Sequence, residues 1–562
     1  MEERNKNKNL EKMDAYFDES INSNSYRQEQ TKERLNMRKQ KVFNLLFSKR
    51  KDYFHNNVNG PNEIDINSLK CNESIKQDVN EYLKTEYDIK TWFKFIFSSN
   101  KNNLYLALFL LRRYIELQIL EIKEDKRVLS RNDTELIQKL VDYLLNDDLR
   151  IAYNSCACLT NLTLFPIHIE KRLYNDKNLE KILQFFNMIT KNISAYTYKT
   201  LLLFMNISTN QDVKVYLMKH DFIKTFYEFI TNIINGNIKF INDLEELNTI
   251  KFCIRILYQL ILVCELDENY MKYFIEFIPY VKIITTKYFV NIDNIAFDEE
   301  ECMPLINLWQ IYTNKFKEDE LISEIIKDNF TQILIKFYKK LKNADKKINF
   351  VHIFCYLSFI DAEHINIIIN DGLFSLLSEE IEKYQYSNVK LLAYLILTCS
   401  NFALGNVGVN KLMLQLGIIY KVMDISIFYI DDKLDNEIII LLRYCLSFII
   451  HHISGLDNDS RKQIIIYKNS LVNKIFCKAL KLDLKDFMKD RILEKIINII
   501  NELNVVSEEI DEEKEKIYDV ALISNSLVDI LNNLYNKPYF DNLFKEAIVQ
   551  CIDFIKDKEK YI

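Results

Sequence analysis

The scarcity of glycine constrains the fold of this chain more than any other feature of its sequence. Glycine occurs seven times in 562 residues, whereas an average protein contains about 7% glycine. Hairpins, β-bulges and phosphate-binding loops depend on glycine, so strand-rich folds and α/β enzymes are disfavoured. With 48% hydrophobic residues and five prolines, the chain is predicted to be a succession of helices with short polar connections. Its length exceeds that of one ordinary compact core, which leaves several domains or one elongated repeat.

A short polar bend followed by an apolar helix recurs along the chain. The bends are centred on Asn178, Asp221, Asn329, Gly372 and Gly417. The first two bends are 43 residues apart, and the last three are spaced by 43 and 45 residues. The gap of 108 residues in the middle leaves room for two units and an insertion around 232–248. A period of about 40–47 residues is typical of armadillo and HEAT repeats, whose units bury their apolar faces by stacking. We therefore predict an all-α, armadillo-type α-solenoid superhelix with one concave groove.

The N-terminal region differs in charge from the rest of the chain. Residues 27–51 contain nine Lys or Arg and two Glu, a net charge of +7, so the remainder of the chain carries −13. We assign residues 1–57 to a flexible, disordered basic arm, 58–87 to a linker, and 88–562 to a solenoid of nine to ten repeats. An acidic interruption at 507–516 is interpreted as a solvated loop, with a docking patch for a basic partner as the alternative. A basic arm beside an acidic body favours docking on the body itself or on an acidic partner.

Asparagines recur near the ends of the predicted third helices. Asn161 ends Cys-Leu-Thr-Asn, Asn206 lies in Phe-Met-Asn-Ile-Ser, and Asn401 lies in Leu-Thr-Cys-Ser-Asn-Phe-Ala-Leu-Gly-Asn. This pattern resembles the importin-α family of nuclear-import adaptors, whose third helices read Trp-x-x-x-Asn. The resemblance implies an armadillo groove that holds the backbone of a cargo peptide, a nuclear localisation signal. The candidate cargo-binding residues are Asn161, Asn206, Asn401 and Trp309.

The basic arm carries a second part of the resemblance. Met-Arg-Lys-Gln-Lys at 37–41 is followed by an apolar stretch and then by Lys-Arg-Lys at 49–51. This order is similar to the importin-β-binding segment of the same family. The residues that would bind importin β are Arg38, Lys39, Lys41, Lys49, Arg50 and Lys51. The resemblance further implies basic cargo proteins, an export receptor at the C-terminal repeats, and shuttling between cytoplasm and nucleus.

The chain departs from the family where lysine side chains would be gripped. One turn before the three asparagines stand Ala157, Leu202 and Leu397 in place of tryptophan, and other repeats pair Arg255 with Gln259. We therefore expect the groove to read its peptide differently from a standard adaptor. The asparagines can alternatively be helix-terminal residues that satisfy backbone groups. Trp309 can alternatively be a core residue.

Catalytic, metal and membrane functions find no support in the sequence. The eleven cysteines include no CxxC pair and are interpreted as reduced core residues, with no cofactor expected and metal binding an alternative that lacks ligand spacing. The HExxH, GxGxxG, Walker A and GxSxG motifs are absent, so no enzyme is predicted. We expect no membrane-spanning segment, because no apolar run of about 18 residues is evident, and no nucleic-acid partner. The alternative function is an armadillo interaction scaffold without import activity.

Overall fold

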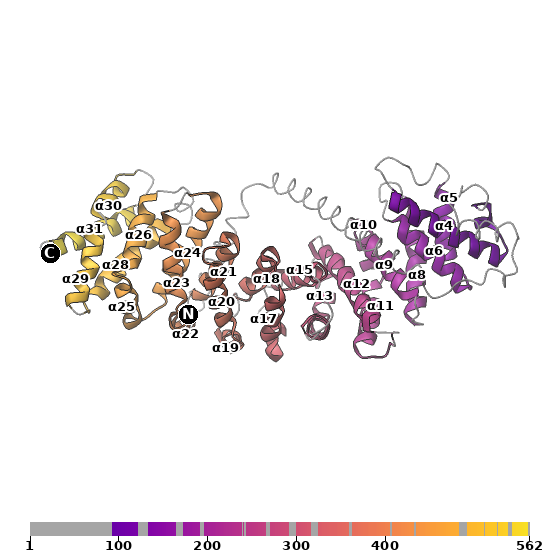
Figure 1. Cartoon of the computed structure of the whole chain (residues 1–562), viewed down its shortest axis with the longest axis horizontal. Coiled ribbons are helices and arrows are strands. Elements are labelled where there is room, and N and C mark those ends of the chain that lie inside the picture. Colours follow the sequence, from indigo (N-terminus) through magenta and orange to yellow (C-terminus); the bar gives the residue numbers. More distant parts are fainter. Residues whose placement is uncertain are drawn as a thin grey trace. The chain divides into compact units, whose positions relative to one another are not determined.

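The computed structural model of the chain is predominantly helical over the residues that it describes, and no strand occurs among them. The described residues are 93–121, 133–163, 172–191, 196–238, 240, 243–265, 270–290, 299–315, 324–358, 362–404, 407–431, 434–482, 492–510, 512–524, 527–537 and 542–559. They fall into two compact units, divided between Ile284 and Thr285, which we call the N-terminal unit and the C-terminal unit. Each is described by itself (Figure 1).

The N-terminal unit contains η2 (Phe93–Phe97), α4 (Lys101–Glu121), α5 (Asp133–Tyr143), α6 (Leu149–Leu162), α8 (Asp176–Lys191), α9 (Tyr196–Ile207), α10 (Gln211–Lys219), α11 (Phe222–Ile234), α12 (Asp243–Ile261), η3 (Leu262–Glu265), α13 (Met271–Ile275) and α14 (Ile278–Ile284). The C-terminal unit contains η5 (Thr285–Val290), α15 (Glu299–Lys315), η6 (Lys327–Asn329), α17 (Phe330–Lys340), α18 (Ala344–Leu357), α19 (Ala362–Asn370), α20 (Leu373–Tyr384), α21 (Val389–Ala403), α22 (Val407–Gln415), α23 (Ile418–Ile430), α24 (Asn436–Ser454), α25 (Asn458–Ile466), α26 (Leu471–Leu482), α28 (Ile492–Ser507), α29 (Glu512–Ser524), α30 (Leu527–Tyr535) and α31 (Asn542–Glu559).

One repeat of the C-terminal unit shows how the sequence builds the fold. Helix α22 is short and ends at a turn where Gly417 has φ +70°, a left-handed conformation that glycine adopts at no steric cost. The chain then reverses into α23, and Asp435 caps α24 by accepting a hydrogen bond from the backbone N–H of Ile438. A short first helix, a second helix and a long third helix form the armadillo triplet. The predicted all-α, armadillo-type solenoid is confirmed.

The bends between first and second helices lie where the sequence predicted them. Left-handed backbone occurs at Asp221, Asn329, Gly372 and Gly417, and Asp and Asn are the non-glycine residues that tolerate it best. The bend at Asn178 is formed differently, because the Asn178 side-chain amide donates to the carbonyl oxygen of Arg172. Four of the five bends therefore contain a residue in the left-handed backbone conformation. The Gly, Asn and Asp residues in the sequence predict it.

Third helices pack side by side within each unit. In the N-terminal unit the series is α4, α6, α9 and α12, and in the C-terminal unit it is α15, α18, α21, α24, α28 and α31. First and second helices pack on them; α23, for example, contacts α24. Aromatic rings fill part of the interior, with Phe204 stacked on Phe222 at 4.8 Å between ring centroids.

Three expectations need correction. The acidic interruption at 507–516 is mostly helical, because α28 ends at Ser507, α29 begins at Glu512, and the described turn between them spans only 508–510. The insertion expected around 232–248 is shorter, since α11 ends at Ile234 and α12 begins at Asp243.

Among the described helices, α24 is long and apolar enough to cross a membrane, and α22 with α23 reach that length only across a 72° bend. Since 61% of the apolar window of α24 is buried, packing explains its composition.

Candidate functional site

The three predicted asparagines lie on third helices but are almost fully buried. The exposed fractions are 4% for Asn161, 7% for Asn206 and 2% for Asn401. The Asn206 amide donates to the carbonyl oxygen of Thr160 and to Oγ1 of Thr163, both at 3.0 Å. Asn206 therefore joins α9 to the end of α6, which is the backbone-satisfying role kept as an alternative. A contact with a cargo peptide stays a prediction for these asparagines.

Asn161 and Asn401 occupy the equivalent place in their own repeats. The Nδ2 of Asn401 donates to Sγ of Cys355 on α18 at 3.2 Å. The Nδ2 of Asn161 is buried and makes no hydrogen bond with the residues that the structure describes. The structure brings Asn161 and Asn206 to neighbouring helices of one unit, whereas Asn401 lies in the other unit.

Trp309 lies in the core of the C-terminal unit. Its side chain is fully buried, and its indole N–H donates to Oγ1 of Thr285 at 3.0 Å. Its ring packs against Phe330 and Tyr312, with centroid distances of 5.0 and 5.7 Å. These contacts match the core alternative, and a peptide contact by Trp309 stays a prediction. The predicted importin-β-binding residues of the arm lie outside the described residues.

Basic side chains lie on the third helices of the N-terminal unit, and sequence reasoning singled out only one of them, Arg255. On a helix, residues separated by 4, 7 or 11 positions share one face. Lys199 precedes Asn206 by seven residues and Arg255 precedes Gln259 by four, so both lie on the stripe that ends in these amides. Arg150 precedes Asn161 by eleven residues and occupies the same stripe of α6. Because this helical spacing can be read from the sequence, it could have identified Arg150, Lys199 and Arg255 as residues on the same faces as the predicted amides.

Contacts between α4 and α6 place a further arginine on this stripe. Nη1 of Arg112 donates to Oδ1 of Asn154 at 3.2 Å, and the Asn154 amide donates to the carbonyl oxygen of Arg150 at 2.8 Å. The Arg112 guanidinium also lies over the Tyr153 ring, 5.8 Å from its centroid. Asn154 thus connects two basic residues of neighbouring helices.

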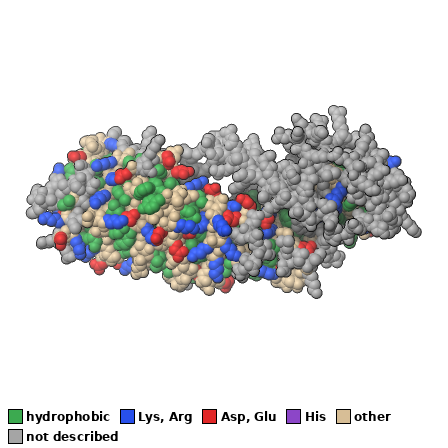
Figure 2. Space-filling view, viewed as in Figure 1, with side chains coloured by type: hydrophobic (Ala, Val, Ile, Leu, Met, Phe, Trp, Pro, Cys, Tyr) green, Lys and Arg blue, Asp and Glu red, His purple; other side chains and the backbone are tan. Residues whose placement is uncertain are grey.

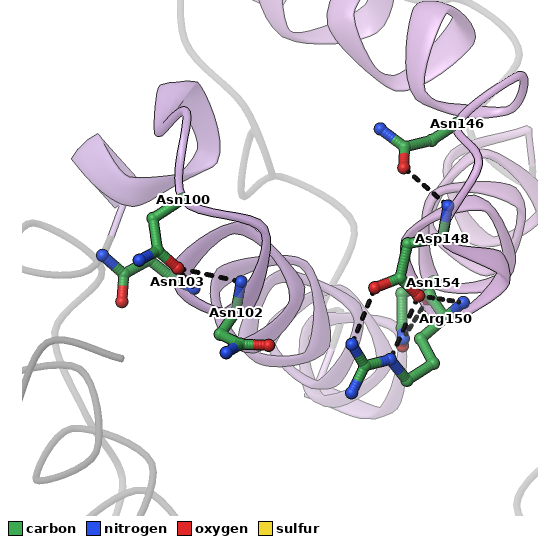
Figure 3. A network of polar contacts seen from close by, with 7 residues as sticks. All are labelled: Asn100, Asn102, Asn103, Asn146, Asp148, Arg150 and Asn154. Atoms are coloured by element: carbon green, nitrogen blue, oxygen red, sulfur yellow. Dashed lines mark hydrogen bonds and ion pairs between the residues drawn. The ribbon is translucent and has the colours of Figure 1, made fainter. Parts of the chain in front are cut away.

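Figure 3 shows the polar network at the start of these two helices. Asp148 caps α6 and forms an ion pair with Arg150, with 2.7 Å between Nη2 and Oδ2. The hydrogen bonds from Arg150 hold the pKa of Asp148 below its usual range. Asn100 caps α4 by accepting from the backbone N–H groups of Asn102 and Asn103. The network fixes the start of both helices and neutralises the charge of one arginine.

The described side chains of the four third helices in the N-terminal unit are predominantly basic. Seven are basic, and they are Lys101, Arg112, Arg113, Arg150, Lys199, Lys251 and Arg255. Two are acidic, Glu245 and Glu246, both in the first turns of α12.

The third helices of the C-terminal unit present a different, polar face. Oγ of Ser400 lies 3.1 Å from Nδ1 of His451 and 3.4 Å from Oγ of Ser447, which joins α21 to α24. His352 on α18 packs against Tyr394 on α21, with 4.6 Å between ring centroids, and burial lowers the pKa of His352 to about 4. Basic and acidic side chains are interspersed over the described part of this unit in the view of Figure 2.

The described residues offer no arrangement suited to a metal ion, since no three His, Cys, Asp or Glu side chains among them converge. The nine cysteines whose side chains the structure describes are buried thiols. Burial raises the pKa of Cys156 and Cys445 to about 12, so these thiols are poor nucleophiles and poor metal ligands.

Comparisons with known proteins support the fold. No protein family and no curated protein matches the sequence. An engineered protein solved by the Northeast Structural Genomics Consortium covers 84% of this chain and 99% of its own, with TM-score 0.53 and 11% identity. A structure from work on the interaction between cadherin and beta-catenin covers 83% of this chain and 94% of its own, with TM-score 0.48 and 10% identity. A designed armadillo repeat protein in complex with the peptide (KR)4 covers 49% of this chain and 99% of its own, with TM-score 0.37 and 13% identity. Of these three, the first has a TM-score above 0.5, and at such low identity it shows a shared fold alone.

Proposed function

We propose that this chain is a protein-interaction scaffold that binds an extended segment of a partner along its third helices. The observation that carries the proposal is the side-by-side packing of third helices, α4 to α12 in one unit and α15 to α31 in the other. Repeats stacked in this way present a continuous binding face. Side-chain hydrogen bonds join neighbouring third helices, from Arg112 to Asn154 in one unit and between Ser400 and His451 in the other.

The test is selection of ligands from a library of random 12-residue peptides against the full chain. Hydrogen exchange of the selected complexes then reports which helices the peptides protect. We expect protection of third helices, such as α6 and α9 or α21 and α24. Protection confined to first and second helices, or a library that yields no ligand, would contradict the proposal.

A second candidate is a nuclear-import adaptor, and the observation that favours it is the arm. Two basic clusters at 37–41 and 49–51 flank an apolar stretch, as in an importin-β-binding segment. Such an adaptor would bind importin β through Arg38, Lys39, Lys41, Lys49, Arg50 and Lys51, carry basic cargo, and shuttle between cytoplasm and nucleus. An export receptor would then be expected at the C-terminal repeats.

The adaptor is tested by retention of the full chain on immobilised importin β. We expect retention that the triple variant Lys49→Glu, Arg50→Glu and Lys51→Glu abolishes. The matched control reverses three exposed lysines on first and second helices of the N-terminal unit, Lys177, Lys219 and Lys224. If both variants are retained like the unmodified chain, the adaptor is excluded and the scaffold remains.

A further inference from the structure

Helices α29, α30 and α31, which we call the C-terminal triplet, pack on α25, α26 and α28 within the C-terminal unit (Figure 1). The junction between these two groups of helices buries several polar side chains. Asn473 on α26 and Tyr518 on α29 are fully buried, and Asn504 on α28 is 2% exposed. Buried polar groups are tolerated when they are hydrogen-bonded, so the hydrogen bonds of these side chains determine how firmly the triplet is held.

The polar cluster is only partly hydrogen-bonded. The Tyr518 hydroxyl donates to Oδ1 of Asn504 at 2.8 Å. Burial raises the pKa of Tyr518, and the nearby Asn473 side chain opposes this rise. Both amide atoms of Asn473 and Nδ2 of Asn504 are buried and have no hydrogen-bond partner among the described residues. The same holds for Oδ1 of Asp519, the residue that follows Tyr518.

Unpaired polar atoms weaken this junction. Each buried atom of this kind costs free energy that hydration recovers when the junction opens. Repeats contact mainly their neighbours, so a weak junction allows one repeat to open without the others. Another buried amide of the same unit is bonded at both ends, because Asn410 donates to the carbonyl oxygen of Ala403 at 2.9 Å and contacts Nδ1 of His452 at 3.1 Å.

We propose that the C-terminal triplet opens from the rest of the C-terminal unit as a separate step, much more often than that unit unfolds as a whole. This inference goes beyond the scaffold function and does not rest on it. Opening uncovers the sides of α26 and α28 on which the triplet packs. It also removes α31 from the series of third helices, so that the series then ends at α28.

Asp519 makes the opening sensitive to pH. Burial raises the pKa of its carboxyl to about 6, Lys558 on α31 opposes the rise, and Glu515 on α29 and Glu508 just after α28 add to it. Opening returns the carboxyl to water, where an aspartate has a pKa of about 3.9. The closed triplet therefore retains a proton that the open triplet loses, so opening is favoured as the pH rises from about 4 to about 6.

Hydrogen exchange of the full chain at pH 7, followed by mass spectrometry of its peptides, measures the opening. We expect the slowest amides of α29, α30 and α31 to exchange together, on the order of 100-fold faster than those of α24. Equal protection of the triplet and α24 would overturn the inference. Exchange of the whole C-terminal unit in one step would overturn it as well.

Two leucine variants test the cause of the opening. Leucine branches at the same side-chain atom as asparagine but has no polar atoms. Asn473→Leu should slow exchange of the triplet by about tenfold, because the closed junction no longer buries unpaired amide atoms. The matched control, Asn410→Leu, removes a bonded amide and should speed exchange around α22 to α24. Circular dichroism checks that both variants fold. Faster exchange of the triplet in Asn473→Leu would show that the polar junction holds the triplet closed, contrary to the inference.

The pH dependence has its own pair of variants. After correction for intrinsic rates, the opening constant of the triplet should rise at least about threefold between pH 5 and pH 7. Asp519→Asn should abolish this rise, whereas Asp529→Asn, at an exposed carboxyl on α30, should preserve it. A rise that survives Asp519→Asn, or no rise at all, would refute the role of Asp519. Failure of the inference leaves the scaffold function standing, because that function is tested by peptide protection of α6 and α9 or of α21 and α24.

Discussion

Among the described side chains of the third helices, basic residues outnumber acidic ones in the N-terminal unit, whereas the two kinds are nearly balanced in the C-terminal unit. Among the described side chains, the counts are seven basic and two acidic in the N-terminal unit, and eight basic and ten acidic in the C-terminal unit. The same repeat architecture thus carries two different surfaces. Because repeats contact mainly their neighbours, surface charge can vary along the chain without disturbing the fold.

Both interiors combine aromatic packing with buried polar groups. Stacked phenylalanines fill part of the N-terminal unit, with Phe186 packed 4.9 Å from Phe204 between ring centroids. The C-terminal unit buries an ion pair between Lys347 and Glu380 and a neutral histidine, His452. Buried charges are tolerated when they are paired, so loss of one partner of the Lys347–Glu380 ion pair should be costly.

The buried ion pair should give the largest effect. Oε2 of Glu380 accepts from Nζ of Lys347 and from the hydroxyl of Tyr338, both at 2.7 Å. Replacing Glu380 with Ala leaves Lys347 buried without its carboxylate, and should lower the free energy of unfolding by about 3–5 kcal/mol. Urea unfolding measures this loss of stability, and hydrogen exchange shows whether it is concentrated in α18 and α20.

A matched control uses an exposed carboxylate in the same unit, Glu382, whose partner Lys421 is partly exposed. Glu382 is bonded to Lys421 at 2.6 Å at the surface, and Glu382→Ala should change stability little. The double variant Lys347→Met and Glu380→Leu should recover most of the stability, because a packed apolar pair replaces the ions. Equal effects of the two Ala substitutions would contradict a special role for burial.

A side chain at Gly455 should destabilise the protein, although the backbone φ of −88° at this residue is ordinary. A Cβ there would lie 2.0 Å from Nδ2 of Asn410. That amide is fixed, since Asn410 is fully buried, donates to the carbonyl oxygen of Ala403 and contacts His452. Gly455→Ala should therefore cost about 1–3 kcal/mol through overpacking. Thermal unfolding of the variant measures this loss of stability. In an Asn410→Ala background, Gly455→Ala should cost almost no further stability, because the clashing amide is gone. An unchanged cost in that background would contradict the clash.

Acid should destabilise the C-terminal unit through its histidines. The Nδ1–H of His452 donates to Oδ1 of Asn410 at 3.1 Å, Nε2 is buried without a partner in the described residues, and burial lowers the pKa of His452 to about 3. The unfolded chain, with a pKa of about 6.5, binds a proton that the folded chain excludes. The free energy of unfolding therefore decreases as the pH falls below about 6.5. At pH 5 the decrease due to His452 should be roughly 2 kcal/mol.

His352, with its pKa lowered to about 4, contributes in the same direction. Hydrogen exchange at pH 7 and pH 5, corrected for intrinsic rates, should show preferential opening around α18 and α24. His452→Gln should reduce this pH dependence near α24. Equal loss of protection in both units would show that the histidines are not the cause.

The sequence predicted the fold better than the site, for a physical reason. Bends at Asp221, Asn329 and Gly372 could be predicted because few residue types tolerate left-handed backbone. Asn206 was predicted to face a ligand, but its amide bonds Thr160 and Thr163. A side-chain amide can form hydrogen bonds with a bound peptide or with a neighbouring helix equally well. Only the packing of the helices determines which of the two it contacts. Lys199 was overlooked because a single lysine on a helix is ordinary until its neighbours on adjacent helices are known.

Two N-cap residues, one in each unit, should give the smallest effect on stability. Asp148 caps α6 and neutralises Arg150 within the N-terminal unit, while Asp435 caps α24 in the C-terminal unit. Asp148→Ala and Asp435→Ala should each cost about 1 kcal/mol through loss of an N-cap, measured by thermal unfolding. Only Asp148 also forms an ion pair, with Arg150 at 2.7 Å, so raising the salt concentration should reduce the loss of stability more for Asp148→Ala than for Asp435→Ala. Equal salt dependence of the two losses would contradict a contribution from the ion pair.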